Sequence, residues 1–89
     1  MMEREVMDLP GYRWVMSRIH SGEKVTVYTN GRHLYHGGQQ FPTKTCTLVG
    51  TYWKHPRALP GFDPLRFIAD VEAAIEHLRE QEKTLRMDA

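Results

Sequence analysis

The chain has 89 residues, of which 40% are hydrophobic and 26% charged, and its formal net charge is +1. This length predicts a single small domain, residues 1–89, with one hydrophobic core, and the composition is that of a globular protein. No apolar run approaches the roughly 20 residues that span a bilayer, and a single cysteine excludes an internal disulfide. We therefore expect a small soluble protein, for which the cytoplasm is the default compartment.

The small net charge hides an asymmetry along the chain. Residues 1–62 carry eight Lys/Arg and four Asp/Glu, a net +4, whereas residues 63–89 carry four and seven, a net −3, and the two parts sum to +1. One interpretation is an acidic helix that docks on a mildly basic sheet of the same chain. The alternative is a basic surface that serves a partner.

The first twenty residues have the least definite pattern. Residues 1–8 have few apolar positions and no periodicity, so we expect a flexible N-terminal arm, followed by a turn at 8–11. In residues 12–19 the apolar positions fit one face of a helix, with Gly22 placed to end it. The same segment also alternates and is rich in aromatic side chains, which is typical of a strand. We favour the helix and keep the strand as the alternative.

Two segments joined by a tight turn predict a β-hairpin. Residues 24–28 alternate, with two valines on one face. Asn30 and Gly31 follow and predict a two-residue type I′ turn, because both residues tolerate a positive φ. Residues 32–36 form the expected return strand.

The third predicted strand, residues 45–53, is rich in threonine, valine and aromatic residues. Alternation places Cys46, Leu48 and Tyr52 on one face, and Gly50 interrupts that face, which predicts a β-bulge or a close backbone approach. Cys46 is then a small buried side chain rather than a nucleophile. In chain order the strands predict an antiparallel meander of three to four strands.

The clearest element is a helix from Asp63 to about residue 85. Asp63 fits the N-cap, and Pro64 fits the first helical position. Apolar residues follow at three- and four-residue spacing on one face: Leu65, Phe67, Ile68, Val71, Ala74, Ile75 and Leu78. The predicted fold class is α+β, an antiparallel β-meander with this long helix packed on one face and a short N-terminal helix. Residues 86–89 are predicted to form a flexible tail.

The motifs that would indicate catalysis or a metal site are missing from the sequence. His33 and His36 form an HxxH, but positions i and i+3 of a strand point to opposite faces, so their imidazoles diverge. The chain has no CxxC, no HExxH and no glycine-rich phosphate loop, and its acidic residues gather on the C-terminal helix. We expect no enzyme activity, no cofactor and no bound metal.

Aromatic and basic residues gather on the polar side of the predicted strands. Aromatic rings interleaved with cations on a sheet can bind single-stranded nucleic acid, by stacking on bases and by neutralising phosphates. The alternative is that these rings belong to the core or cover the second face of the sheet. The candidates for binding a partner protein or nucleic acid are Tyr28, Arg32, His33, Tyr35, Lys44, Trp53, Lys54, His55 and Arg57.

The predicted helix is longer than three short strands can cover. Its apolar stripe continues to Leu78 and Leu85, with one break at Glu82, so this end is a candidate for pairing with a second chain; the alternative is a solvated last turn. We therefore predict a non-enzymatic binding protein that acts through protein–protein contacts, including contacts with a copy of itself. Nucleic-acid binding through the strand face is the alternative function, and no membrane contact is expected.

Overall fold

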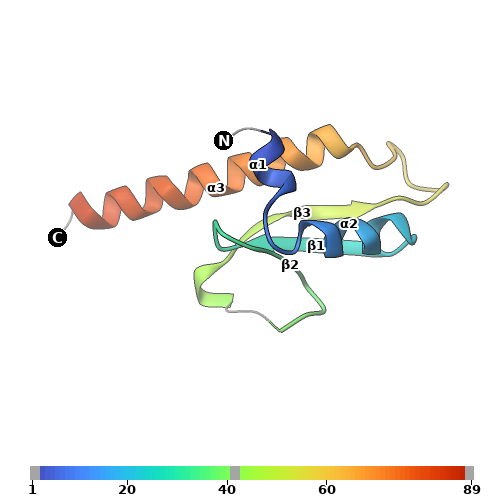
Figure 1. The fold of residues 1–89 in the computed structure, drawn as a ribbon. Coiled ribbons are helices and arrows are strands. Elements are labelled where there is room, and N and C mark those ends of the chain that lie inside the picture. Colours follow the sequence, from blue (N-terminus) through green and yellow to red (C-terminus); the bar gives the residue numbers. More distant parts are fainter. Residues whose placement is uncertain (1–2, 41–42, 88–89) are drawn as a thin grey trace.

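The computed structural model describes residues 3–40 and 43–87, which form a three-stranded antiparallel sheet and three α-helices (Figure 1). The predicted α+β class, the long C-terminal helix and the short N-terminal helix over residues 12–19 are confirmed. The elements in chain order are α1 (Glu3–Met7), α2 (Tyr12–His20), β1 (Lys24–Thr29), β2 (Leu34–His36), the 3₁₀ turn η1 (Thr43–Thr45), β3 (Thr47–Trp53) and α3 (Pro64–Met87).

Helices α2 and α3 pack on the same face of the sheet, which we name the inner face. The predicted alternation of β1 is confirmed, because Val25, Val27 and Thr29 are buried while the residues between them are not. Residues of both helices and of α1 complete one hydrophobic cluster with this face. Its fully or almost fully buried members are Val6, Val15, Ile19, Val25, Val27, Leu34, Phe67, Ile68, Val71 and Ile75.

The strand order β2-β1-β3 differs from the predicted meander, in which the second strand would be central. Instead, β1 is central and pairs antiparallel with both neighbours. Two properties of the chain favour this order. Strand β2 has only three residues, and residues 37–46 between β2 and β3 are long enough to lead the chain from one sheet edge to the other.

The predicted two-residue type I′ turn is wrong. Thr29 pairs with Leu34, which leaves a four-residue loop, and no described residue other than glycine has a positive φ. Asn30 instead accepts hydrogen bonds on its side-chain oxygen from the backbone N–H groups of Arg32 and His33, both at 2.9 Å. This Asx turn competes with the type I′ geometry, because Asn can cap the backbone without adopting a positive φ itself.

The bulge predicted near Gly50 is confirmed, and it changes which side chains share a face. Val27 pairs with Gly50, but Tyr28 pairs with Leu48, so Val49 is the extra residue of β3. Leu48 therefore lies on the opposite face from Tyr52 and is 56% exposed, which corrects the prediction that the two share a face. Cys46 lies before β3 rather than within it and is half-buried.

The flexible arm predicted for residues 1–8 is wrong over its described part. Residues 3–7 form α1, and Val6 is fully buried in the core. The backbone that follows is fixed on β2, because the Leu34 N–H donates to the Pro10 carbonyl at 2.8 Å. Gly11 then turns into α2 with a φ of +91°, and a Cβ at this position would overlap the Leu34 carbonyl oxygen. One apolar side chain thus anchors a segment with no periodicity.

The predicted N-cap of α3 is confirmed, because the Leu65 N–H donates to Asp63 Oδ1 at 3.0 Å. The apolar stripe is buried as predicted from Phe67 to Ile75, but Leu65 is 65% exposed and does not belong to it. Leu65 lies in the first turn, at the end of the helix where the chain enters from the 54–63 loop. The helix continues to Met87, so Arg86 and Met87 are helical rather than part of the predicted tail, and residues 88–89 lie outside the described residues.

The C-terminal half of α3 extends past the sheet (Figure 1). The helix has 24 residues and is about 36 Å long. The radius of gyration of 13.7 Å exceeds the roughly 12 Å expected for a compact chain of this length, and the longest dimension is 49 Å. The extended shape follows from the length of this one helix.

Candidate functional site

The face of the sheet turned away from α2 and α3 carries the predicted aromatic candidates, and we name it the outer face. Cross-strand partners share a face, so the register assigns its members. They are Lys24, Thr26, Tyr28, Tyr35, Leu48, Thr51 and Trp53. The prediction left open whether the helix covers these rings. Both helices pack on the inner face, so neither packs on the face that carries the rings.

One end of the outer face joins two tyrosines and a leucine. Tyr28 of the central strand has Tyr35 as its partner on one side and Leu48 on the other. The His33 ring stacks on Tyr35, with 6.0 Å between ring centroids and 26° between planes. Exposed Arg32 lies in the adjoining loop. Three aromatic rings (Tyr28, His33 and Tyr35) therefore lie near the β1–β2 turn, together with one apolar side chain, Leu48, and one basic residue, Arg32.

The other end of the outer face centres on Trp53. Its ring stacks on His55, with centroids 4.5 Å apart and planes 18° apart, and its indole N–H donates to the Gly22 carbonyl at 2.9 Å. The His55 Nδ1 accepts a hydrogen bond from the backbone N–H of Arg57. The Lys54 ammonium donates to His20 Nδ1 at 3.1 Å. Trp53 is therefore held in one orientation with two cations nearby in the chain.

The structure thus divides eight of the nine predicted binding residues into two groups rather than one cluster. The Lys24–Trp53 pair and the Tyr28–Leu48 pair are four residues apart along β1, which corresponds to about 13 Å. Between them lie Thr26 and Thr51, whose hydroxyl oxygens are 3.1 Å apart. Exposed Lys44 lies in η1, outside the strands.

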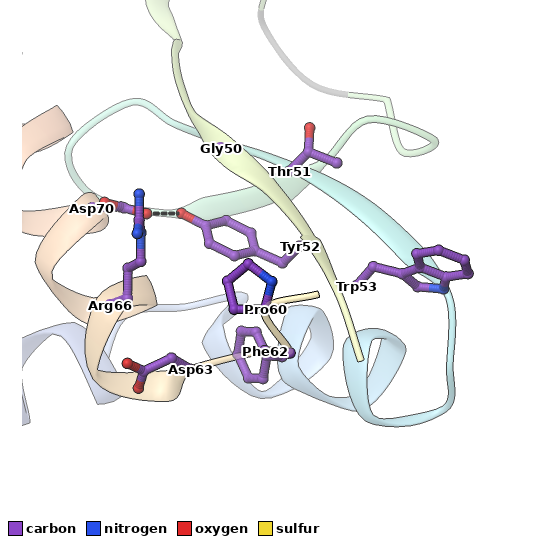
Figure 2. A pocket seen from close by; sticks show the side chains of 10 residues that line it. Gly50, Thr51, Tyr52, Trp53, Pro60, Phe62, Asp63, Arg66 and Asp70 are labelled. Carbon is purple, nitrogen blue, oxygen red and sulfur yellow. Dashed lines mark hydrogen bonds between the residues drawn. The ribbon is translucent and has the colours of Figure 1, made fainter. Parts of the chain in front are cut away.

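A pocket with a volume of about 500 Å³ opens between β3 and the start of α3 (Figure 2). This volume is within the range of about 300–1,000 Å³ found for small-molecule sites. Figure 2 shows the Tyr52 and Trp53 side chains leaving β3 in opposite directions. The pocket is lined by Gly50, Thr51, Tyr52, Trp53, Pro60, Gly61, Phe62, Asp63, Arg66 and Asp70.

A hydrogen bond between Tyr52 and Asp70 crosses the upper side of this pocket. The Tyr52 hydroxyl donates to Asp70 Oδ2 at 2.7 Å, and the ring packs edge-on against Phe67 with centroids 4.8 Å apart. A Cβ at Gly50 would lie 2.7 Å from the Tyr52 hydroxyl oxygen, so the absence of a side chain at Gly50 makes room for the ring. Gly50, which interrupts this strand face in the sequence, therefore leaves the space that the Tyr52 hydroxyl occupies.

Burial, followed by the hydrogen bond to Asp70, raises the pKa of Tyr52 well above its ordinary value, and nearby Arg66 partly opposes this. The hydroxyl therefore stays protonated at neutral pH and acts as a donor rather than a base. Asp63, at the pocket rim, caps α3. Arg66 takes no part in the ion pair found among the described residues, which joins Arg18 to Glu23. Of the polar groups that line the pocket, Tyr52 and Asp70 join β3 to α3, and Asp63 caps the helix.

The predicted self-association residues lie on the extended part of α3. Ile75 is the last buried residue among the side chains described, Leu78 is half-buried, and residues 79–83 are exposed. A Cβ at Gly31 would lie 3.8 Å from the Leu78 side chain, so Leu78 reaches the β1–β2 turn of its own chain. Leu85 is on the helical backbone, and its side chain lies outside the described part.

Cys46 and the HxxH pair, His33 and His36, are the residues that the sequence offered for nucleophilic or metal chemistry. Burial raises the pKa of the Cys46 thiol, against a smaller lowering by a hydrogen bond with Thr45, so the thiol is the protonated, less nucleophilic form at neutral pH. His33 lies in the turn and His36 in β2. Within residues 3–40 and 43–87, no group of three or more His, Cys, Asp or Glu side chains could hold a metal ion.

Two features of these surfaces were missed by the sequence reasoning. Leu48 was predicted to share a face with Tyr52, and the bulge is the signal that separates them, since a bulge at Gly50 inverts the face of every residue before it. The contact between Tyr52 and Asp70 joins positions 18 residues apart in different elements, and local periodicity carries no information about such a pair.

No helix in the described part of the chain is both long enough and apolar enough to cross a membrane. Comparisons with protein-family models, with curated proteins and with solved structures found no match.

Proposed function

We propose that this chain is a non-enzymatic interaction protein that binds a second copy of itself through the C-terminal half of α3. The observation that carries the proposal is that the α3 backbone stays helical over residues 76–87, beyond the last buried side chain described, Ile75. These 12 residues extend for about 18 Å. An isolated helix of this length is marginal in water, so a partner that covers it would add stability.

The sequence of this half of α3 suits a contact between identical chains. Residues 76–87 contain three acidic residues, Glu76, Glu80 and Glu82, and three Lys or Arg residues, Arg79, Lys83 and Arg86. A surface with equal numbers of both signs can face a copy of itself without accumulating like charge. A strongly acidic or basic partner would gain little from it.

Two leucines provide the apolar part of the proposed contact. Leu78 and Leu85 are seven residues apart, so their backbone positions lie on nearly the same side of the helix. They continue the spacing of Ile68, Val71 and Ile75, which packs on the sheet in the same chain. The stripe that forms the core thus continues into the proposed dimer contact.

The test is the mass in solution, measured by light scattering over a range of concentrations, for the wild type and for Leu85→Glu. We expect a concentration-dependent dimer for the wild type and a monomer for Leu85→Glu, because a carboxylate in an apolar contact must be desolvated. Ala73→Glu is the matched control. It adds the same charge to the same helix at an exposed position on a different side, and it should remain dimeric.

Circular dichroism must show that both variants keep the wild-type helix content. A wild-type monomer at every concentration would overturn the proposal. A dimer that is equally strong in wild type and Leu85→Glu would place the contact elsewhere and also contradict it.

A further inference from the structure

We propose that the outer face of the sheet binds single-stranded nucleic acid. In this site, Tyr35 and Trp53 stack on bases at the two ends of the face, and Lys24, Arg32, Lys44 and Arg57 neutralise phosphates. This inference is independent of self-association through α3, because the outer face is on the opposite side of the sheet from the helices.

The charge of the sheet supports an anionic ligand. From residue 24 to residue 62 the chain contains five Lys or Arg residues and no Asp or Glu. All three strands lie within this segment. Four acidic residues of the chain precede this segment and seven follow it, and five of those seven belong to α3, which packs on the inner face. The near-neutral net charge therefore conceals a basic segment that contains the whole sheet.

The aromatic rings of this face are already oriented. Trp53 is fixed by its hydrogen bond to Gly22 and by stacking on His55, and Tyr35 stacks on His33. Rings that are held before binding lose little conformational entropy when a base stacks on them. A histidine beside each ring adds a second flat group.

The spacing of the rings favours an extended, unpaired strand over a duplex. The two aromatic ends are about 13 Å apart along β1, and the threonine pair between them, Thr26 and Thr51, offers hydroxyl groups but no bulky side chain. Bases within a duplex are stacked on one another and cannot reach rings on a flat sheet, whereas bases of a single strand can be splayed over it.

The experiment is fluorescence anisotropy of a labelled, mixed-sequence single-stranded oligonucleotide of about 16 nucleotides, titrated with the full chain. With four phosphates neutralised, a single strand gives a slope of log affinity against log salt of about −2.8, so affinity should fall about 50-fold between 50 and 200 mM salt. Tyr35→Leu should weaken binding by about 5- to 150-fold, the loss found for one stacked base. This change keeps an apolar side chain on the sheet, and circular dichroism must show an intact fold.

The charge test is the double variant Lys24→Glu/Arg57→Glu, which should abolish binding at low salt. Its matched control is Arg4→Glu/Arg13→Glu, which makes the same change in charge at exposed positions of α1 and α2, away from the outer face. The control should bind within a few-fold of the wild type. Equal losses in both variants would mean that net charge alone is responsible and would overturn the assigned site.

Two competitors separate nucleic acid from other polyanions. A duplex of the same length and poly-glutamate should each compete more weakly than unlabelled single strand. Competition by duplex or by poly-glutamate at equal strength would show that the face recognises charge alone and would overturn the proposal. No change in anisotropy at low salt would also overturn it.

Discussion

Replacing Tyr52 by phenylalanine tests whether the hydrogen bond between β3 and α3 fixes the position of the helix. The substitution keeps the ring against Phe67 and removes only the hydroxyl that donates to Asp70. A hydrogen bond to a charged group contributes about 1.5–3 kcal/mol. Since Tyr52 is half-buried, we expect a loss near the lower value, about 1.5 kcal/mol. For a domain of this size, that loss lowers the Tm by about 6–12 °C.

The pH dependence of this loss distinguishes the hydrogen bond from a general packing effect. Burial and the hydrogen bond raise the pKa of Tyr52 in the folded protein above its ordinary value of 10.0. Above pH 10 the unfolded chain therefore loses a proton that the folded protein retains, and the stability of the wild type falls as the pH rises. The slope from this group is at most about 1.4 kcal/mol per pH unit, and less because solvent screens a half-buried hydroxyl.

Phenylalanine has no proton to lose, so Tyr52→Phe lacks this part of the pH dependence. The difference in stability between the wild type and Tyr52→Phe should be complete below pH 10 and should shrink above it. Urea denaturation followed by circular dichroism at pH 7, 9 and 10.5 measures this difference. A difference that stays constant across the three pH values, or a Tyr52→Phe variant as stable as the wild type at pH 7, would refute the reasoning.

Three further changes probe the caps, the turn and the thiol. Asp63→Ala removes the N-cap of α3 and should cost about 1 kcal/mol in urea denaturation, whereas Asp63→Asn should cost much less because Asn also caps. Asn30→Ala removes the acceptor of two backbone N–H groups and should cost about 1–2 kcal/mol; an unchanged midpoint would contradict the Asx turn. Cys46 should react slowly with a thiol reagent in the native protein and at the rate of a free thiol in urea, because burial raises its pKa. Equal rates in the two states would show that Cys46 is accessible.

The elements that could be predicted from the sequence are those whose signals are local. Asp63 and Pro64 mark the start of α3 because capping depends on a few adjacent residues. The alternation of Val25 and Val27 predicts that this segment is a strand, because the period of a strand is two. These signals need no knowledge of what the element packs against.

The features that could not be predicted depend on contacts between distant parts of the chain. The position of β1 at the centre of the sheet follows from tertiary packing, since a meander and the observed order contain the same three strands. The burial of Val6 depends on α3 lying beside α1 (Figure 1). The exposure of Leu48 follows from one extra residue, Val49, in β3. For the candidate site, the sequence identified the aromatic and basic residues, and the structure divided them between two ends of one face.

The two proposed surfaces have a joint consequence, because they lie on different sides of the molecule and can be occupied together. A dimer formed through α3 would carry two outer faces, and a nucleic acid long enough to reach both would bind the second face as an intramolecular step. Dimerisation should then strengthen binding to a long single strand by as much as about 100-fold, yet leave binding to a strand that fills one face unchanged.

Leu85→Glu separates these effects, with Ala73→Glu as the control of equal charge. On a short oligonucleotide the two variants should bind alike. On a strand of several times that length, Leu85→Glu should lose the additional affinity that Ala73→Glu keeps. If Leu85→Glu is monomeric but binds long strands as tightly as the control, the outer face acts alone and the dimer has a different role. If both variants bind short strands much more weakly than the wild type, charge on α3 reaches the outer face and the two surfaces are not independent.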